Sequence, residues 1–384
     1  MPRLDQLCNI QYGYAFNADL FTTKSSQGVP LVRIRDVVRG YTETYTPESF
    51  SEAYRVHDGD ILIGMDGEFN VARWHGGDAA LNQRVCKITP RNNIHSQYLF
   101  YFLPQALKRI EDQTPFVTVK HLSAKKLSAI EVPDISMMEQ ANIAERLDII
   151  TTLLANRRQV DEQLAELPKA RFVEMFGDLA FNPHGWKSIP IADLCAASDD
   201  IKCGPFGTQL SQSEYITSGV PVWGIPQVNA NFQLPTKDFI TSEKAKKLSS
   251  YTLIPGDIVM SRKGNVGRCA VYPQNFPFGI LHSDVLRIRV NREVCDPTFL
   301  MQQLHDSRVV QTQIEVISNG AIMAGLNVTK LKSLCVHLPP LPAQRRFAAF
   351  ARACAAQRAA CAHQIAVLET LRGKLLQDAF GAAG

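Results

Sequence analysis

The sequence predicts an α+β protein made of two duplicated lobes that are joined by two long antiparallel helices. Two observations carry this prediction: a series of short motifs occurs twice in the same order, and each series ends in an apolar pattern of helical period. The chain of 384 residues, 45% hydrophobic and 20% charged, is long enough for two domains that each bury a core. A duplication of this kind predicts a pseudo-two-fold relation between the halves.

The duplication rests on pairs of motifs that keep their order. The pairs are Leu7-Cys8 and Leu194-Cys195, Gly28-Val-Pro and Gly219-Val-Pro, Gly59-Asp-Ile and Gly256-Asp-Ile, Tyr98-Leu99 and Phe299-Leu300, and Lys126-Leu127 and Lys330-Leu331. The offset between the copies grows through 187, 191, 197 and 201 to 204 residues, and it then stays at 204 as far as Gly177 and Gly381. Two copies of one fold with loops of different length, followed by helices of equal length, produce this pattern.

Each copy begins with short runs of β-branched and aromatic residues that glycine, proline and asparagine interrupt. Such runs predict strands, and they occur at 29–38, 60–64 and 84–88 in the first copy and at 220–228, 257–261 and 285–290 in the second. Helices are expected next, at about 97–113 and 297–316, and a segment containing proline ends each copy. We therefore expect one lobe at 1–134 (lobe 1) and another at 179–340 (lobe 2).

A heptad pattern follows each lobe. In the first copy, apolar residues recur every three or four positions from Ile143 to Leu154. In the second copy, the positions at strict intervals of seven are Phe347, Cys354, Cys361, Leu368 and Leu375. The pattern predicts a central long helix at 135–178 and a C-terminal long helix at 341–384 that pair as a coiled coil.

Charge and cysteine content limit the class of protein. The formal net charge is +4; residues 1–177 carry 20 basic and 22 acidic side chains, and residues 178–384 carry 21 and 15. A protein that bound nucleic acid by phosphate attraction alone would be more basic. The nine cysteines are scattered and include no Cys-x-x-Cys pair, which predicts reduced thiols in a cytoplasmic protein. No apolar run reaches the eighteen residues of a membrane span, and no membrane partner is expected.

Motifs that would indicate catalysis are absent from the sequence. It contains no Asn-Pro-Pro-Tyr or Asp-Pro-Pro-Tyr of an adenine methyltransferase, no phosphate-binding G-x-x-x-x-G-K-[ST] motif, and no histidine pair at zinc-ligand spacing. We therefore expect a protein with no catalytic residues, no cofactor and no metal.

Taken together, these features resemble the specificity subunits of type I restriction–modification systems over essentially the whole chain. The resemblance is carried by Gly59-Asp60-Ile61-Leu62 and Gly256-Asp257-Ile258-Val259, and by the helix entry Leu341-Pro342-Ala343-Gln344. The first copy of that entry is less clean, since Ser136-Met137-Met138-Glu139 stands where the family has proline-rich sequence.

The resemblance implies different roles for the lobes and for the long helices. Residues 1–134 and 179–340 would be two target-recognition domains, each reading one half of a split target in double-stranded DNA. The paired helices would hold the halves apart and bind two methyltransferase subunits, to which restriction and translocase subunits are added. The chain itself would direct these enzymes without catalysis of its own.

Candidate DNA-reading residues are polar and basic side chains on glycine-rich loops, because arginine suits guanine, amides suit adenine and carboxylates accept from cytosine. The loop after Gly59-Asp60 is acidic, whereas the equivalent loop after Gly256-Asp257 is basic, as lobes tuned to different sequences should show. The candidates in lobe 1 are Arg33, Arg35, Asp66, Glu68, Asn70, Arg73, Gln83, Arg84, Lys120 and His121. The candidates in lobe 2 are Gln209, Gln227, Asn229, Arg262, Lys263, Asn265, Arg268 and Asn319.

Other interpretations of these residues and of the whole chain stay open at this point. The loops could be glycine-rich turns with solvated charges, Arg33 and Arg35 could flank a buried Ile34 on a surface strand, and His282 is expected to be structural. The whole chain could instead be a coiled-coil scaffold whose lobes bind proteins or carbohydrates. A self-contained restriction enzyme is disfavoured by the missing catalytic motifs.

Overall fold

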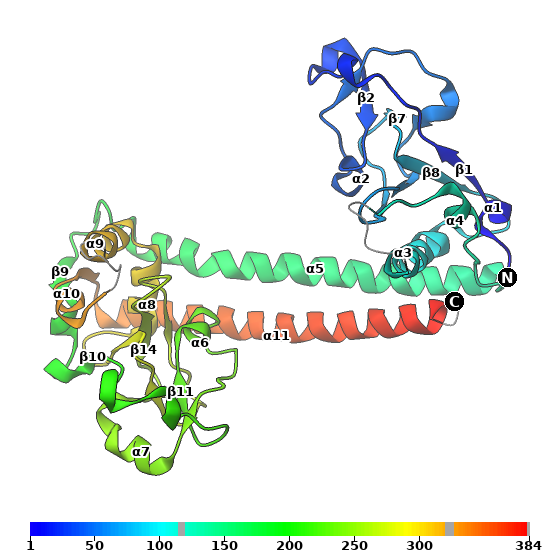
Figure 1. Ribbon diagram of the computed structural model, residues 1–384. Coiled ribbons are helices and arrows are strands. Elements are labelled where there is room, and N and C mark those ends of the chain that lie inside the picture. The colour runs from blue at the N-terminus through cyan, green and yellow to red at the C-terminus, as the bar shows by residue number, and fades with distance from the viewer. Residues whose placement is uncertain (114–119, 319–325, 382–384) are drawn as a thin grey trace. The chain divides into compact units, whose positions relative to one another are not determined.

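A computed structural model describes residues 1–113, 120–318 and 326–381 of the protein. The chain divides into two compact units: unit 1 comprises Met1–Arg158 with His363–Gly384, and unit 2 comprises Gln159–Ala362. Each unit contains one lobe and a part of each long helix, α5 (Met137–Phe176) and α11 (Leu341–Phe380), which are green and red in Figure 1.

The described residues of lobe 1 form two four-stranded sheets. The first is antiparallel, in the order β1 (Cys8–Tyr12), β8 (Val85–Pro90), β5 (Ile61–Gly64) and β6 (Val71–Arg73). The second has the order β3 (Tyr45–Thr46), β2 (Val29–Val32), β7 (Ala79–Leu81) and β4 (Arg55–Val56), and its β2–β7 pair is parallel.

Lobe 2 repeats this topology in its described residues. One sheet has the order β10 (Ile201–Cys203), β17 (Val285–Ile288), β14 (Ile258–Ser261) and β15 (Cys269–Val271). The other has the order β12 (Phe239–Ile240), β11 (Val220–Trp223), β16 (Gly279–Leu281) and β13 (Thr252–Leu253), with β11–β16 parallel; a further pair joins β9 (Lys187–Pro190) to β18 (Cys335–Leu338). Strand order, direction and register all recur, which confirms the duplication.

The shared Gly-Asp-Ile motif builds the turn and the strand at the centre of each lobe. Gly59 and Gly256 have φ of +90° and +93°, a left-handed conformation that glycine adopts without strain. The next residue closes the turn, since the Oδ2 atoms of Asp60 and Asp257 accept the backbone N–H three residues earlier at 2.9 Å. The strand that follows, β5 or β14, is buried along its whole length because its alternate residues enter two different hydrophobic clusters.

The helices of the lobes pack beside these sheets. Lobe 1 contains α1 (Leu4–Leu7), α2 (Asp36–Arg39), α3 (Ser96–Asp112) and α4 (Ala124–Ser128). Lobe 2 contains α6 (Ile225–Asn229), α7 (Ser242–Lys247), α8 (Pro297–Asp306), α9 (Arg308–Ser318) and α10 (Val328–Lys332).

The structure corrects three of the predicted elements. The strands predicted at 29–38 and 220–228 end at Val32 and Trp223, and short helices follow. The side chain of Asp36 accepts the N–H of Arg33 at 3.0 Å and so turns the chain, and in the second copy Pro226 occupies the first turn of α6. The single helix predicted at 297–316 is divided into α8 and α9 because Ser307 has an extended backbone.

The two long helices have the same length, 40 residues, and their bounds differ by the predicted offset of 204. Within unit 1, Arg158 of α5 pairs with Glu369 of α11 at 2.6 Å; within unit 2, Arg358 of α11 pairs with Asp161 of α5 at 3.0 Å. These pairs confirm the antiparallel arrangement. The heptad positions of α11 are buried or half-buried, as the pattern predicts for a coiled coil.

Each lobe packs against the beginning of one long helix and the end of the other. In unit 1, Phe380 at the end of α11 is buried against Tyr98 and Phe102 of α3, with ring centroids 5.2 and 5.6 Å apart. In unit 2, its counterpart Phe176 at the end of α5 is buried against Phe299 and other aromatic rings. Each hydrophobic core therefore contains residues from both repeats of the chain.

A buried glutamine connects the first turn of each long helix to its lobe. Gln140 Oε1 accepts the N–H of His95 at 2.8 Å, and its amide donates to the carbonyl of Ile135. Gln344 does the same in unit 2: it accepts the N–H of Asp296 at 3.0 Å and donates to the carbonyl of Pro339 at 2.7 Å. The glutamine of the predicted helix entry therefore fixes the start of the lobe helix, α3 or α8, on the long helix.

Replacing Gln344 with alanine should lower the free energy of unfolding of unit 2 by about 2–4 kcal/mol, because the N–H of Asp296 and the carbonyl of Pro339 would stay buried without partners. The measurement is urea denaturation followed by hydrogen exchange, with Gln357→Ala, an exposed position on the same helix, as the control. Equal stability of the two variants would contradict this role for Gln344.

Candidate nucleic-acid interface

Three of the predicted residues of lobe 1, from three separate segments of the sequence, meet at one place. Asp66 follows β5, Arg84 precedes β8, and His121 lies just beyond residues 114–119. The Asp66 carboxylate lies 2.5 Å from Nδ1 of His121 and 3.4 Å from Nε of Arg84. We call these three residues the lobe 1 cluster.

Backbone hydrogen bonds set the place of this cluster. Met65 N–H donates to the carbonyl of Arg84 at 2.9 Å, and Leu122 N–H donates to the carbonyl of Met65 at 2.7 Å. Arg84 itself has φ of +72°, a left-handed conformation in the tight turn before β8. The main chain therefore holds the three segments together, and the charged side chains project from this framework.

The same hydrogen bonds identify the equivalent residues of lobe 2. Arg262 N–H donates to the carbonyl of Asp284 at 3.1 Å, and Leu326 N–H donates to the carbonyl of Arg262 at 3.1 Å. Arg262 is thus the counterpart of Met65, Lys263 that of Asp66, and Asp284 that of Arg84. Lys263 and Asp284 form an ion pair at 2.6 Å, and Nδ1 of His282 lies 3.7 Å from Asp284. Lys263, His282 and Asp284 are the lobe 2 cluster.

The other candidates in lobe 1 divide into exposed and packed side chains. Two of the side chains are exposed, those of Glu68 and of Gln83 beside Arg84, and the side chain of Asn70 is half-buried. The ammonium group of Lys120 donates to the carbonyl of Glu111 at 2.8 Å. Arg73 is packed: its guanidinium donates to Gly59, Ser96 and Gln97, lies over the ring of Phe100, and has its pKa lowered by burial.

Arg33 and Arg35 lie in the turn after β2 and not on the basic strand that the sequence suggested. Arg33 lies over the ring of Phe21, and Arg35 contacts Thr44 at 3.2 Å and Asp36 at 3.7 Å. Both therefore contact residues near β2 rather than the lobe 1 cluster.

The remaining candidates in lobe 2 are also divided. Gln227 is buried, and its amide bonds Gly224 and Pro235 within the lobe. Gln209 is exposed, and its side-chain oxygen accepts from the hydroxyl of Tyr251. The side chains of Asn229 and Asn265 are also exposed, and that of Arg268 is half-buried. The guanidinium of Arg262 is half-buried beside the carbonyl of Ser283 at 3.4 Å. Asn319 lies outside the described residues.

Sequence reasoning missed Asp284 and interpreted His282 as structural. Asp284 stands directly before the strand that begins at Val285, as Arg84 stands directly before Val85. Aligning the two strands would have identified Asp284 as the counterpart of Arg84. The two residues have opposite charges, however, so a search for similar residues does not find Asp284.

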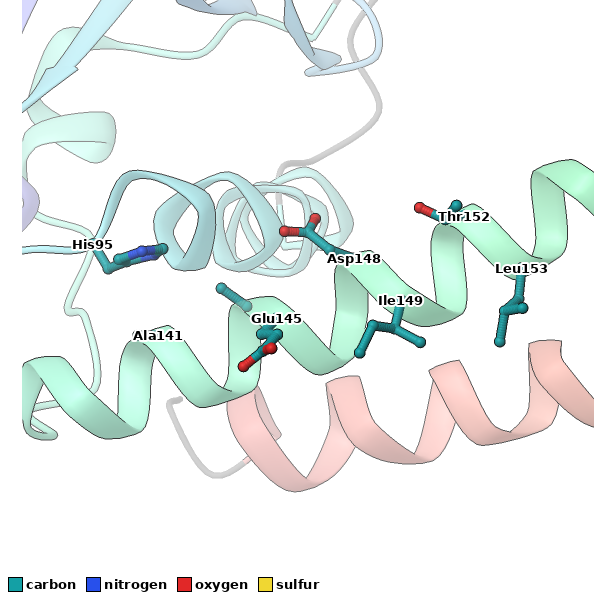
Figure 2. A pocket seen from close by; sticks show the side chains of 8 residues that line it. His95, Ala141, Glu145, Asp148, Ile149, Thr152 and Leu153 are labelled. Atoms are coloured by element: carbon teal, nitrogen blue, oxygen red, sulfur yellow. The ribbon is translucent and has the colours of Figure 1, made fainter.

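A shallow groove of about 540 Å³ lies on α5 beside α3 in unit 1. Figure 2 shows its side chains along α5, with His95 at one end and Leu153 at the other. Asp148 accepts from Gln97 and from the hydroxyl of Tyr101, both at 2.6 Å, whereas Ile149 and Leu153 remain exposed. This apolar and acidic surface suits contact with another protein better than contact with DNA phosphates.

One cysteine–histidine contact could suggest a nucleophile, but its environment makes it inert. Cys269 Sγ lies 3.3 Å from Nε2 of His305 inside lobe 2. Burial raises the pKa of the Cys269 thiol to about 12 and lowers the pKa of His305 to about 4, so both groups are neutral at physiological pH. Within the described ranges, no group of three or more acidic, histidine and cysteine side chains is placed to hold a metal ion.

The helices of the described residues include none that is both long enough and apolar enough to span a membrane.

All nine cysteines lie in described segments, and all are free thiols.

Comparisons with known proteins all find DNA specificity subunits of type I restriction systems. A family model described as "Type I restriction modification DNA specificity domain" matches residues 1–166 and 183–366. The specificity subunit of the type I restriction enzyme EcoBI from Escherichia coli is 29% identical over 369 residues, which cover 89% of this chain and 76% of that protein. The MjaVIII specificity subunit from Methanocaldococcus jannaschii is 23% identical, over 76% of this chain and 71% of that protein.

The fold also matches that of a solved protein. The crystal structure of a type I restriction–modification S subunit from M. genitalium superimposes with a TM-score of 0.66 over 99% of this chain and 95% of that chain, at 16% sequence identity. Two repeated lobes joined by long helices are thus an arrangement that a solved S subunit shares.

Proposed function

This chain belongs to the family of type I restriction–modification DNA specificity subunits, and on that premise we propose that each of its lobes reads one half of a split DNA target. The chain provides DNA sequence specificity within a restriction–modification system and has no catalysis of its own. The interpretation as a scaffold for carbohydrates or unrelated proteins is not favoured, because the family model of a DNA specificity domain matches both lobes.

The observation that carries the proposal of two readers is the contrast between the clusters. The lobes have the same strand order and register, yet the residues at equivalent positions of the clusters differ in charge. A fold that only had to be stable would gain nothing from this contrast, whereas two readers of different sequences require it. The proposed interface also contains five exposed or half-buried side chains: Gln83, Glu68, Asn229, Asn265 and Arg268.

Arg73 and Gln227 are better explained as parts of the framework. Their polar atoms are satisfied inside the lobe, so contact with a base would require these hydrogen bonds to break. We propose that they hold the loops on which the reading residues lie.

The partners are DNA and the modification and restriction subunits of the system. We propose that two methyltransferase subunits bind, one at each repeat, on the long helices. The groove on α5 and the exposed alanines Ala355, Ala356, Ala359 and Ala360 of α11 offer low-polarity surface for this contact. Because these partners act on DNA, we propose that the chain functions in the cytoplasm.

The proposal is tested by mapping methylated bases in cells that express the methyltransferase subunits with and without this chain. The expected result is methylation at a split sequence with an unread spacer, and only when the chain is present. The same methylated sites with and without the chain, or a target without a spacer, would overturn the proposal.

A further inference from the structure

The two clusters contain one ion pair with its charges exchanged. In lobe 1 the carboxylate of Asp66 comes from the loop after the central strand, and the cation of Arg84 comes from the turn before the neighbouring strand. In lobe 2 the cation of Lys263 comes from the loop, and the carboxylate of Asp284 comes from the turn. Both pairs keep opposite charges in contact, and only their order is reversed.

Stability does not explain why both lobes keep this pair. The side chains of Arg84 and Asp66 are 55% and 26% exposed, and those of Lys263 and Asp284 are 59% and 29% exposed. Ion pairs whose cation is exposed and whose carboxylate is half-buried, as here, are partly screened by solvent and contribute little to folding. The backbone hydrogen bonds that join the same segments are present in both lobes whichever charge stands at each position.

Phosphate binding does not explain the pair either. A phosphate contact needs an excess of positive charge, and the cation at each of these positions has a carboxylate beside it. That carboxylate would repel a phosphate and compete with it for the cation. An adjacent donor and acceptor, however, match a surface that itself presents an acceptor next to a donor.

The major-groove edge of a G·C pair is such a surface. Guanine presents the acceptors O6 and N7, which suit lysine and arginine, and cytosine presents an amino group, which suits a carboxylate. The charged atoms are 3.4 Å apart in lobe 1 and 2.6 Å apart in lobe 2, close enough to reach the two halves of one base pair.

We propose, on the basis of the proposed DNA-reading function, that each pair reads one G·C base pair and that the order of its charges sets the order of the two bases. Lobe 1 reads guanine with Arg84 and cytosine with Asp66. Lobe 2 reads guanine with Lys263 and cytosine with Asp284, so its base pair has the opposite orientation relative to the lobe.

The histidine of each cluster lies beside the aspartate, and His121 of lobe 1 is a positioning residue in this scheme. Nδ1 of His121 lies 2.5 Å from Oδ1 of Asp66. In lobe 2, Nδ1 of His282 accepts the backbone N–H of Asp284 at 3.1 Å and lies 3.7 Å from its carboxylate. The imidazole of His121, which also lies 3.4 Å from Nη1 of Arg84, limits the rotamers that the Asp66 carboxylate can adopt. His282 instead fixes the backbone at Asp284.

The test reverses the two charges of the ion pair in one lobe of the full chain, which is expressed with its methyltransferase partners. The methylated sites of a plasmid library with randomised half-sites are then sequenced. Asp66→Arg with Arg84→Asp should replace G·C by C·G at one position of one half-site, with a preference of roughly 10- to 100-fold. Lys263→Asp with Asp284→Lys should do the same at one position of the other half-site.

A matched control reverses another exposed ion pair of lobe 1, Arg3→Asp with Asp5→Arg, whose side chains are 53% and 37% exposed. It should leave every position of the target unchanged. If a reversed variant is folded but inactive, Asp66→Asn and Arg84→Gln decide the matter: each should relax the same single G·C position.

Two outcomes overturn the inference while the proposed function stands: a reversed variant that keeps the wild-type target, or single variants that weaken all sequences equally. Failure of the wild-type chain to direct methylation to any defined sequence would instead overturn the proposed function. The wild-type target therefore separates the two kinds of failure.

Discussion

Replacing residues 179–340 with the equivalent lobe of another specificity subunit should change one half of the methylated sequence and leave the other half as it was. The original half-site should then be methylated roughly 10³-fold less than the new one, since each mismatched base pair costs about 1–3 kcal/mol and a half-site contains several. The physical reason is that each lobe has its own sheets and its own charged cluster. The measurement is sequencing of methylated bases.

The graft must preserve the contacts that lobe 2 makes with the long helix of its unit. Arg352 of α11 contacts Thr298 at 3.3 Å and Asp296 at 3.6 Å, and Gln344 holds the start of α8. At the equivalent place in unit 1, Asp148 accepts from Gln97 and Tyr101. A graft taken from the first lobe of a relative should therefore fold poorly on α11 unless Arg352 is replaced as well.

The control for the exchange is the same chain with its own residues 179–340 recloned through the same junctions. A change in both halves of the target would contradict the assignment of one half-site to each lobe, and so would no change in either half. The boundaries at 134, 178 and 340 stay predictions until such exchanges define them.

The second large effect concerns the ends of the long helices. Phe380→Ala should lower the free energy of unfolding of unit 1 by about 3–5 kcal/mol, because a buried ring that contacts Tyr98 and Phe102 would leave a cavity. Phe176→Ala should have an effect of similar size on unit 2. Hydrogen exchange in denaturant should therefore show faster exchange in the lobe that each ring contacts.

Phe181→Ala is the matched control, since this ring is 83% exposed. It should change the free energy of unfolding by less than about 0.5 kcal/mol. If Phe380→Ala were as mild as Phe181→Ala, or if it loosened unit 2 rather than unit 1, the described core of unit 1 would be wrong.

Repetition made much of the fold predictable. The constant offset of 204 predicted two helices of equal length, and the short β-branched runs at 60–64 and 257–261 predicted the strands that became β5 and β14. The errors occurred where one residue redirects the backbone through a short hydrogen bond or a single extended conformation, as at Asp36 and Ser307. Local propensity does not reveal such contacts.

The candidate site was predictable residue by residue but not as an arrangement. Asp66, Arg84 and His121 were each identified on their own segment, yet their contact depends on the pairing of β5 with β8. Arg73 and Gln227 have the same side-chain chemistry as base readers but are bonded within the lobe, a difference that only tertiary structure shows. Asp284 required knowledge of which positions are equivalent.

The position of Phe380 also determines when the protein can finish folding during its synthesis. Phe176 of unit 2 is translated before lobe 2, whereas the core of lobe 1 lacks Phe380, which is translated 204 residues after Phe176. At about 5–20 residues per second, this interval lasts roughly 10–40 s. During that time the aromatic face of α3 has no final partner, so the lobe that is made first is completed last.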